Sequence, residues 1–400
     1  MSAKLQELLN RLCPDGVEYK TLGEIATDMY RGAGIKRDQI TTDGTPCVRY
    51  GEIYTEYGIW FASCISHTDE SLLTIKKYFS HGDILFAITG EKVEDIAKSC
   101  AYVGHETCLA GGDIVVMKHN QNPKYLSYAL ATRQATKQKT QGRVKSKVVH
   151  SNVPSIKSIS IPVPPLEIQE EIVRILDKFT ELTAELTAEL TARKRQYEHY
   201  RHLLLHKPSY VKIKIGKVGP VCMCKRILKS QTTSAGIPFY KIGTFGKKPD
   251  SYIPEDLFDT YKRKYKYPHK GDILISASGT IGRIVTYDGE PAYFQDSNIV
   301  WIDNDEKRIL NRFLAYCYEE QPWVSSDGGT ISRLYNDNIA QAEIPAPSRE
   351  EQMRIISVLD SFSTLCNDLT KGLPAEIEAR RKQYEYYRDK LLTFKPLEHA

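Results

Sequence analysis

Short motifs with residues of catalytic type are scattered along the chain, but each lacks part of the pattern that its chemistry requires. Residues 122–125, Asn-Pro-Lys-Tyr, come nearest to the motif with which amino-methyltransferases hold a target amine. Lysine replaces the second proline, and no glycine-rich cofactor loop accompanies the motif. We therefore predict that Asn122 begins a helix.

Candidate metal ligands are equally incomplete. Asp15 and Glu18 lie in one short segment, whereas a metal-dependent nuclease places its carboxylates on successive strands. Cys222 and Cys224 lack partners at zinc spacing, which favours a buried strand face, and His105 lacks the second histidine of a zinc helix. A GxxxxGK[ST] phosphate loop is absent from the sequence. We expect no catalysis, and no metal or cofactor bound by this chain.

The composition excludes several other classes of protein. Apolar residues make up 41% and charged residues 26% of the 400 residues, which is ordinary for two or three globular domains. No apolar run approaches the roughly 18 residues that span a bilayer, and the first ten residues do not resemble a signal peptide. Nine scattered cysteines match no disulfide framework. We expect a cytoplasmic protein without membrane contacts.

Positive charge is concentrated in two stretches. Residues 131–160 contain seven lysines or arginines and no acid, and residues 207–250 contain ten against the single acid Asp250. Many acids lie in the segment that begins at Glu167. Two basic regions divided by an acidic one favour two footprints on a nucleic acid. A solvated lysine-rich surface is the alternative interpretation.

Two loops before proline-rich segments, residues 140–152 and 327–338, contain glycine, hydroxyl groups and arginine. Arg143 and Arg333 are suited to a guanine edge and their neighbours to phosphates, although a surface turn has the same composition. Lysines alternate with tyrosines in residues 261–272, which predicts a cationic strand face or a protected sheet edge. The predicted DNA-contacting residues are Arg31, Lys36, Arg37, Arg49, Lys139, Arg143, Lys145, Lys147, Lys225, Arg226, Lys241, Lys264, Lys266, Arg283, Thr330, Ser332 and Arg333.

The second half of the chain repeats the first. Residues 166–179 return as 349–362, and residues 192–205 return as 379–392, with fainter echoes in the blocks before them. Proline-rich segments precede both helical blocks and mark boundaries. We predict globular domains at 1–164 and 207–347, alternating with helices at 165–206 and 348–396.

Each globular domain is predicted to be a small mixed α/β domain, so that the chain is of the α+β class. Short runs rich in branched and aromatic residues, including residues 48–54, predict a mainly antiparallel, twisted sheet. One helix is expected in each domain, near residues 123–134 and 308–319.

Both helical segments carry apolar seams that need a partner helix. The spacing of three and four residues predicts that they pair as an antiparallel coiled coil, with the domains at opposite ends and a pseudo-twofold axis between them. Gly372 and Pro374 should break or kink the second helix. The residues predicted to form the seam or to dock a partner on it are Gln169, Leu176, Phe179, Leu182, Leu186, Leu190, Tyr197, Gln352, Leu359, Phe362 and Tyr384.

A tandem tetrapeptide lies within the first seam, because residues 180–193 spell Thr-Ala-Glu-Leu twice. Four residues are close to the helical repeat of about 3.6, so each copy lengthens the helix by about 6 Å and turns its apolar face only slightly. We therefore expect the number of tetrapeptide copies to set the length of this helix.

Two diverged basic domains alternating with two near-identical helices resemble the specificity subunit of type I restriction-modification systems, and the tandem tetrapeptide is similar to the repeat of its type IC branch. This resemblance implies that each domain reads one half of a split DNA site through the major groove. It also implies that the helices dock two modification subunits and that restriction subunits then join. S-adenosylmethionine, ATP and magnesium are expected on those partners.

Two alternatives remain open. The recognition subunit of a type IIB-like enzyme would have the same architecture, and a coiled-coil scaffold with two protein-binding domains would contact no DNA. The sequence determines neither the bases read nor the spacer length, because pairing of side chains with bases depends on geometry. It also leaves open the oligomeric state of the isolated chain and whether a cognate restriction subunit exists.

Overall fold

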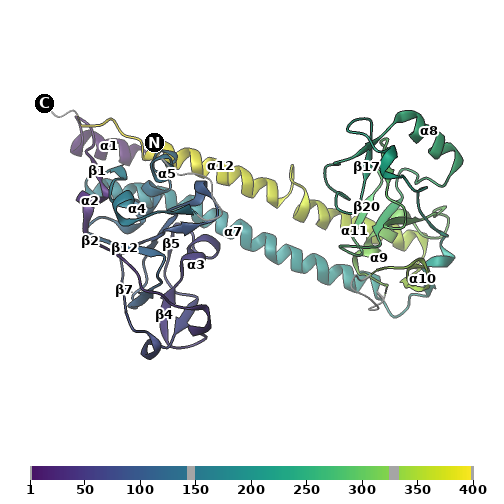
Figure 1. Ribbon diagram of the computed structural model, residues 1–400, viewed down its shortest axis with the longest axis horizontal. Helices are drawn as coiled ribbons and strands as arrows, with labels where there is room; N and C mark the ends of the chain where they lie inside the picture. Colours follow the sequence, from purple (N-terminus) through teal and green to yellow (C-terminus); the bar gives the residue numbers. More distant parts are fainter. Residues whose placement is uncertain (1, 142–148, 324–332, 398–400) are drawn as a thin grey trace. The chain divides into compact units, whose positions relative to one another are not determined.

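The computed structural model describes residues 2–141, 149–323 and 333–397, which form two compact units (Figure 1). Unit 1 comprises Met1–Thr187 and Glu376–Ala400, and unit 2 comprises Ala188–Ala375. The 40-residue helix α7 (Leu166–Leu205) belongs to both units. Within the described part of the chain, no helix is both long and apolar enough to cross a membrane. The predicted division into four segments stays a prediction, because the compact units divide α7 instead of ending at it.

Unit 1 is built on two five-stranded sheets, with strand orders β2-β12-β8-β10-β5 and β3-β6-β4-β11-β7. Its strands are β1 (Tyr19–Thr21), β2 (Ala26–Arg31), β3 (Ile40–Thr41), β4 (Thr45–Val48), β5 (Trp60–Phe61), β6 (Ser66–Thr68), β7 (Tyr78–Phe79), β8 (Ile84–Ala87), β9 (Thr89–Gly90), β10 (Ser99–Tyr102), β11 (Cys108–Ala110), β12 (Ile114–His119), β13 (Val149–His150) and β14 (Ser160–Pro162). Its helices besides α7 are α1 (Ala3–Leu12), α2 (Leu22–Ile25), α3 (Tyr50–Thr55), α4 (Pro123–Leu130), α5 (Arg133–Thr140), α6 (Val153–Lys157) and most of α12 (Leu373–Leu391).

The first sheet of unit 1 lies between two cores, because successive side chains of a strand point to opposite faces. Ile84 and Phe86 of β8 pack with α1, α4 and α7, whereas Leu85 and Ala87 pack with α3 and the second sheet. The order of layers is therefore helices, first sheet, second sheet.

Unit 2 repeats this plan with fewer strands, in sheets ordered β16-β22-β19-β20 and β18-β17-β21. Its strands are β15 (Lys212–Lys214), β16 (Val221–Cys222), β17 (Ile237–Tyr240), β18 (Tyr252–Ile253), β19 (Ile273–Ser276), β20 (Ile284–Thr286), β21 (Tyr293–Phe294), β22 (Ile299–Ile302) and β23 (Glu343–Pro345). Its helices are α8 (Glu255–Lys264), α9 (Asn311–Glu319), α10 (Asn336–Gln341) and α11 (Arg349–Asn367), together with the second half of α7. Ile273 and Ile275 of β19 face the helices, and Leu274 faces the second sheet.

The sequence repeat is a structural repeat, which confirms the predicted fold class. The turns before β4 and β17 both use a glycine with a left-handed backbone, Gly44 at φ 119° and Gly236 at φ 126°. Both strands then pair parallel to a neighbour, β4 with β11 and β17 with β21. After each strand a side chain caps the chain in the same way: Arg49 N–H donates to Glu52, and Lys241 N–H donates to Thr244.

A helix pair closes each unit. Since α7 leaves unit 1 at Thr187 and the C-terminal helix enters it at Glu376, the two run antiparallel. Phe179 stacks on Tyr387 in unit 1, with ring centroids 5.4 Å apart, and the equivalent rings of Phe362 and Tyr200 lie 5.7 Å apart in unit 2.

The packed face of α7 differs from the predicted seam. Leu182 is 36% exposed, and Thr183 lies on the packed face in its place. A series of buried and half-buried positions therefore keeps an alternating spacing of four and three residues through the tetrapeptides. They are Ile172, Leu176, Phe179, Thr183, Leu186, Leu190, Arg193 and Tyr197.

The C-terminal helix is broken, as predicted. Helix α11 ends at Asn367 and α12 starts at Leu373, with Pro374 in its first turn, where a missing N–H costs nothing. Between them the Asp368 carboxylate accepts bonds from the N–H groups of Thr370 and Lys371. Leu369 lies in this break and is 79% exposed.

Repeated polar residues anchor each sheet layer to its helix. The fully buried Gln169 accepts a bond from Asn122 N–H (3.0 Å) and donates to Pro164 O (2.7 Å). Gln352, also fully buried, makes the same contacts with Leu310 N–H (2.9 Å) and Pro347 O (3.0 Å). These glutamines hold the starts of α4 and α9, so they are unavailable to a docking partner.

A second anchor lies two turns along each helix. Asp177 accepts bonds from Lys124 and Tyr128, each at 2.7 Å. Asp360 accepts from Arg312 (2.7 Å) and from the Tyr316 hydroxyl. Asn122 begins α4 as predicted, since its side chain accepts from Tyr125 N–H at 3.1 Å.

Three secondary-structure predictions are wrong. Each unit contains more than one helix besides its long ones. Residues 50–54 were expected in a strand but lie in α3, whose start is capped by the Glu52 carboxylate through Arg49 N–H. Residues 261–264, expected to be extended, end α8, whose acidic first turn and basic last turn suit a helix dipole.

Substituting Gln169→Leu should leave Asn122 N–H buried without a partner, at a cost of about 1–3 kcal/mol. We expect a lower thermal unfolding midpoint, measured by circular dichroism. Gln196→Leu is the matched control on the same helix, because Gln196 is half-buried and bonds Arg193 of α7. Equal midpoints for the two variants would contradict the anchoring role.

Candidate nucleic-acid interface

Cationic side chains gather at one end of the first sheet in unit 1. At this end, called the loop end, β8 finishes at Ala87 opposite the start of β12 at Ile114. Arg31 finishes β2 there, and Arg49 follows β4. The backbones approach closely: Ala33 N–H donates to Ala110 O, and a Cβ on Gly32 would lie 2.2 Å from Gly111 O.

Two adjoining hollows of about 560 and 780 Å³ open at this loop end and share Gly34, Gly112 and Asp113. Arg37 and Arg49 line the smaller one; Arg31 and Lys36 line the larger one. The structure therefore brings together the four predicted contacts of the first 50 residues. Lys77, missed by the sequence analysis, also lines the larger hollow.

The cations of the loop end are of two kinds. Arg31 pairs with Asp113 at 2.6 Å and Arg49 with Glu52 at 3.0 Å, so acids fix the direction of both guanidinium groups. Lys36 and Arg37 are exposed, and no ion pair joins them to an acid within the described residues. Arginines whose direction is fixed by an acid are suited to hydrogen bonding with base edges, whereas exposed cations are suited to contacts with phosphates.

Exposed apolar side chains accompany these cations. Ile65 and Tyr50 lie in the smaller hollow, and Leu72 and Ile75 in the larger one. Apolar groups of this kind contact thymine methyl groups in the major groove. A mixture of fixed arginines, exposed cations and apolar contacts is suited to readout of a duplex.

The loop end of unit 2 carries other side chains on an equivalent backbone. Lys241 occupies the place of Arg49 and pairs with Asp250 at 2.9 Å. Arg283 donates to Phe245 O (2.9 Å), and Arg333 donates to Ser297 O (3.0 Å). These two arginines brace the loops beside the start of β22, and both are half-buried.

The other predicted contacts of unit 2 lie apart from these arginines. Lys225 and Arg226 follow β16 and are exposed, and Lys225 lies 5.3 Å from the ring centre of Tyr265. Lys264 ends α8. Lys266 pairs with Asp303 at 2.5 Å, at the end of β22 opposite Arg333. The single cationic stripe expected over residues 261–272 is therefore not formed.

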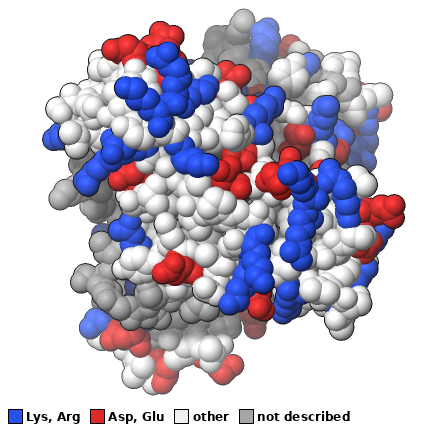
Figure 2. Space-filling model, turned by 90° about the vertical axis from the view of Figure 1, so that its right-hand side faces the viewer, with Lys and Arg blue, Asp and Glu red and all other residues white. Residues whose placement is uncertain are grey.

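Figure 2 shows one face of the protein, on which Lys and Arg side chains form separate groups with acids between them. Charge alone does not outline a footprint on this face.

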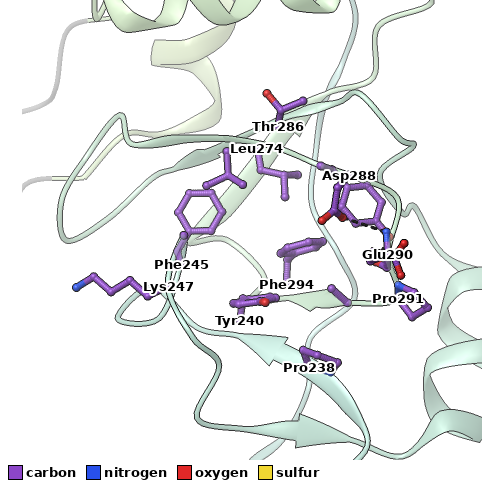
Figure 3. A pocket seen from close by; sticks show the side chains of 14 residues that line it. Pro238, Tyr240, Phe245, Lys247, Leu274, Thr286, Asp288, Glu290, Pro291 and Phe294 are labelled. Atoms are coloured by element: carbon purple, nitrogen blue, oxygen red, sulfur yellow. Dashed lines mark hydrogen bonds between the residues drawn. The ribbon is translucent and has the colours of Figure 1, made fainter. Parts of the chain in front are cut away.

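An aromatic cavity of about 250 Å³ lies in unit 2 (Figure 3). Tyr240 and Phe294 stack in its wall with centroids 5.9 Å apart, and Asp288 and Glu290 line its rim. Lys247 points away from it in Figure 3. Acids at the rim disfavour a phosphate, and none of the predicted DNA contacts lines this cavity.

Five predicted contacts, Arg143, Lys145, Lys147, Thr330 and Ser332, lie outside the described residues. His150 follows Arg143, Lys145 and Lys147 in the sequence and was not among the predicted contacts. Its Nδ1 atom is 3.2 Å from Thr89 Oγ1. His150 is the β-pairing partner of Thr89, and Arg333 is the β-pairing partner of Ser278. His150 and Arg333 therefore occupy equivalent positions in the two units. The repeat could have revealed this, because both residues precede the anchoring glutamine by the same distance in sequence.

Lys139 is not a DNA contact. Its side chain is buried, and the ammonium group donates only to Ser99 Oγ at 3.3 Å among the described residues. Burial lowers the pKa of Lys139 to about 7. The sequence could not show this, since α5 turns Lys139 inward and leaves Lys137 exposed.

Residues 14–193 and 209–379 both match the family model of the type I restriction modification DNA specificity domain. The chain belongs to this family. The two matched segments follow the internal repeat, and the resemblance drawn from the helical blocks is thereby confirmed.

Relatives in the specificity-domain family support the assignment. A putative type I restriction enzyme specificity subunit of Haemophilus influenzae is 59% identical over 249 residues, covering 60% of this chain and 65% of that protein. The EcoR124I/EcoR124II specificity subunit of Escherichia coli is 36% identical over 264 residues, covering 60% and 64%. The matches thus span less than two thirds of the length of these curated relatives.

Solved structures share the fold of this family member. A chain from a study of complex assembly and conformational transition of the type I R-M system has a TM-score of 0.61 at 17% identity, covering 95% of this chain and 98% of that one. The type I S subunit from M. genitalium has a TM-score of 0.52 at 14% identity, covering 94% and 96%. At such identities the likeness establishes the fold alone.

Substituting Lys139→Met should stabilise the protein in a pH-dependent way. The unfolded lysine titrates near 10.5 and the folded one near 7, so between these values the unfolded state binds more protons and wild-type stability rises with pH. The gain in thermal midpoint on substitution should be largest at or below about pH 7 and shrink toward pH 10. Lys137→Met is the exposed control on the same helix. A gain that does not depend on pH would contradict the burial of a titrating amine.

Proposed function

We propose that this chain is the sequence-specific DNA-recognition subunit of a cytoplasmic type I restriction-modification complex, in which each unit reads one half of a bipartite site in double-stranded DNA. It performs no catalysis itself. The family supports this proposal, and one structural observation carries it: the two loop ends share backbone, turns and caps but differ in their side chains. Arg49 is replaced by Lys241 and His150 by Arg333. Two copies of one backbone that carry different DNA-contacting side chains are suited to recognising two different half-sites.

The proposed partners are two modification subunits, joined by restriction subunits. Leu182 and Leu365 support two docking sites, because they occupy equivalent places in the helical repeats and stay 36% and 38% exposed. Apolar side chains on an otherwise charged helix favour a protein partner. S-adenosylmethionine, ATP and magnesium belong to the partners in this proposal, and no membrane contact is part of it.

Mapping methylated adenines in cells that carry the system tests this function. One motif made of two half-sites with a fixed spacer is expected, because two separate units read the DNA. A continuous motif or no motif would contradict the proposal. A type IIB-like enzyme would give the same pattern but act without separate restriction subunits. A scaffold would show neither salt-dependent binding to duplex DNA nor a sequence preference.

Replacing Lys36 and Arg37 together by alanine should weaken binding of the chain with its modification subunit to all duplexes alike. In a plot of the logarithm of affinity against the logarithm of salt concentration, the magnitude of the slope should fall by about 1–2, since phosphate contacts release counterions. Fluorescence anisotropy over a salt series measures both quantities. The matched control replaces the exposed Lys178 and Lys194 of α7. Equal losses in the two double variants would mean that only net charge matters.

Deleting Thr183–Leu186 should shorten the spacer of the recognised site. One tetrapeptide contributes about 6 Å of helix, which corresponds to between one and two base pairs at about 3.4 Å each. The seam survives, because Thr187 and Leu190 take the places of Thr183 and Leu186. Methylation mapping measures the spacer of the recognised site. Leu186→Ala is the control, because this substitution leaves the length of the helix unchanged. Altered half-sites with an unaltered spacer would show that the repeat serves packing alone.

A further inference from the structure

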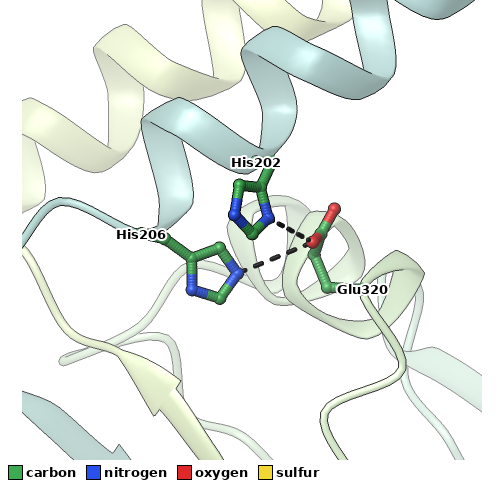
Figure 4. A group of neighbouring side chains, drawn as sticks. All are labelled: His202, His206 and Glu320. Atoms are coloured by element: carbon green, nitrogen blue, oxygen red, sulfur yellow. Dashed lines mark hydrogen bonds and ion pairs between the residues drawn. The ribbon is translucent and has the colours of Figure 1, made fainter.

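Two imidazoles and a carboxylate converge in unit 2 where α7 ends beside α9 (Figure 4). His202 lies in the last turn of α7 and His206 directly follows the helix, with ring centroids 4.3 Å apart. Glu320 directly follows α9, and its Oε2 atom is 3.3 Å from His202 Nδ1 and 3.5 Å from His206 Nε2. The three ligand atoms all lie within 4.8 Å of one another.

We propose that His202, His206 and Glu320 form a binding site for a divalent transition-metal ion of the zinc class. Bonds of about 2.0–2.1 Å meeting at a tetrahedral angle separate their ligand atoms by about 3.3 Å, close to both distances from Glu320 Oε2. Two imidazole nitrogens and one carboxylate oxygen suit Zn²⁺, Co²⁺ or Ni²⁺, whereas Mg²⁺ and Ca²⁺ prefer oxygen ligands throughout.

Neighbouring charges prepare the carboxylate for this role. Arg201 donates to the other oxygen of Glu320, Oε1, at 2.6 Å, which orients Oε2 toward the imidazoles.

The charge of Arg201 is balanced within the same cluster. Its Nη1 group donates to Glu319 Oε2 at 2.7 Å, so one guanidinium faces two carboxylates. With neutral imidazoles the cluster carries a net negative charge before a metal ion binds. The last turn of α7 adds the negative end of the helix dipole, which also favours a cation.

Unit 1 shows that the fold does not need these imidazoles. In the helical repeat, Asp389 stands in the place of His202 and Thr393 in that of His206. Asp389 pairs with Arg133 at 3.3 Å, so an ordinary ion pair holds the helix to the domain there. In unit 2 the helix supplies a cation, Arg201, and the domain supplies the acids Glu319 and Glu320, so this ion pair already holds the helix to the domain without the imidazoles. Docking of helix and domain alone therefore does not explain the cluster.

The site has room for a further ligand, since the side chains of His202 and His206 are 63% and 41% exposed. A water molecule or a side chain from another protein can complete the coordination. A bound ion would link the last turn of α7 to the domain of unit 2 and stabilise it. This proposal departs from the sequence-based expectation that the chain binds no metal, because no sequence pattern joins Glu320 to the two histidines.

Titration of the full chain, purified without a histidine tag, with Zn²⁺ and Co²⁺ tests the site. We expect one ion per chain by calorimetry, a rise in the thermal midpoint, and visible Co²⁺ bands without a thiolate-to-cobalt charge-transfer band. His206→Ala and Glu320→Gln should each weaken binding by more than about tenfold. His199→Ala is the matched control, because His199 is an exposed histidine on the same helix outside the cluster.

Three results would overturn the site. They are no binding by the wild-type chain, binding of unchanged affinity in His206→Ala, and a thiolate band, which would place the ion on some of the nine cysteines. His206 is exposed, so its truncation should leave the circular dichroism spectrum unchanged. A loss of binding in that folded variant, with retention in His199→Ala, supports the site.

Discussion

Two buried glutamines determine how each sheet is attached to its long helix. Gln169 and Gln352 are fully buried, and each satisfies a backbone N–H at the start of a domain helix and a carbonyl before the long helix. A buried amide that is fully hydrogen-bonded permits only one geometry, because any shift leaves a polar group without a partner. These anchors therefore fix how α4 and α9 begin against the long helices.

The anchors explain which parts of the repeat are alike. The helical blocks match closely because their polar and aromatic residues have equivalent partners in the two units. Gln169, Asp177 and Phe179 of unit 1 correspond to Gln352, Asp360 and Phe362 of unit 2. The loop ends need only a common backbone, which Gly44 and Gly236 and the caps after β4 and β17 supply. Side chains beyond that frame are free to differ.

The internal repeat and the long helices could be predicted from the sequence, because repetition and apolar spacing are readable along the chain. The seam was predicted one residue out of phase at Leu182, since leucine is more apolar than threonine and only the partner helix selects Thr183. Helix α3 was missed because its cap joins Arg49 to Glu52 within a run of strand-forming residues. Strand positions such as Ile84 and Ile273 were predictable from composition alone.

The candidate site was less predictable. Arg31, Lys36, Arg37 and Arg49 meet because β2 and β4 both end at the same place, which spacing in sequence does not reveal. Lys139 was misjudged because charge counts ignore which way a helix faces. His150 and Glu320 were missed because each acquires its role from a residue more than 50 positions away.

The break between α11 and α12 makes the two arms of the repeat mechanically unequal. Helix α7 is one uninterrupted rod of 40 residues, whereas its partner is two shorter rods joined by the Asp368 turn. A continuous rod transmits a change in its length in whole turns. The two aromatic contacts, Phe179 with Tyr387 and Tyr200 with Phe362, are made by different halves of this partner. We therefore expect a gain or loss of one tetrapeptide to be tolerated without changes in the opposite arm, because each half of the broken helix has its own contact with α7.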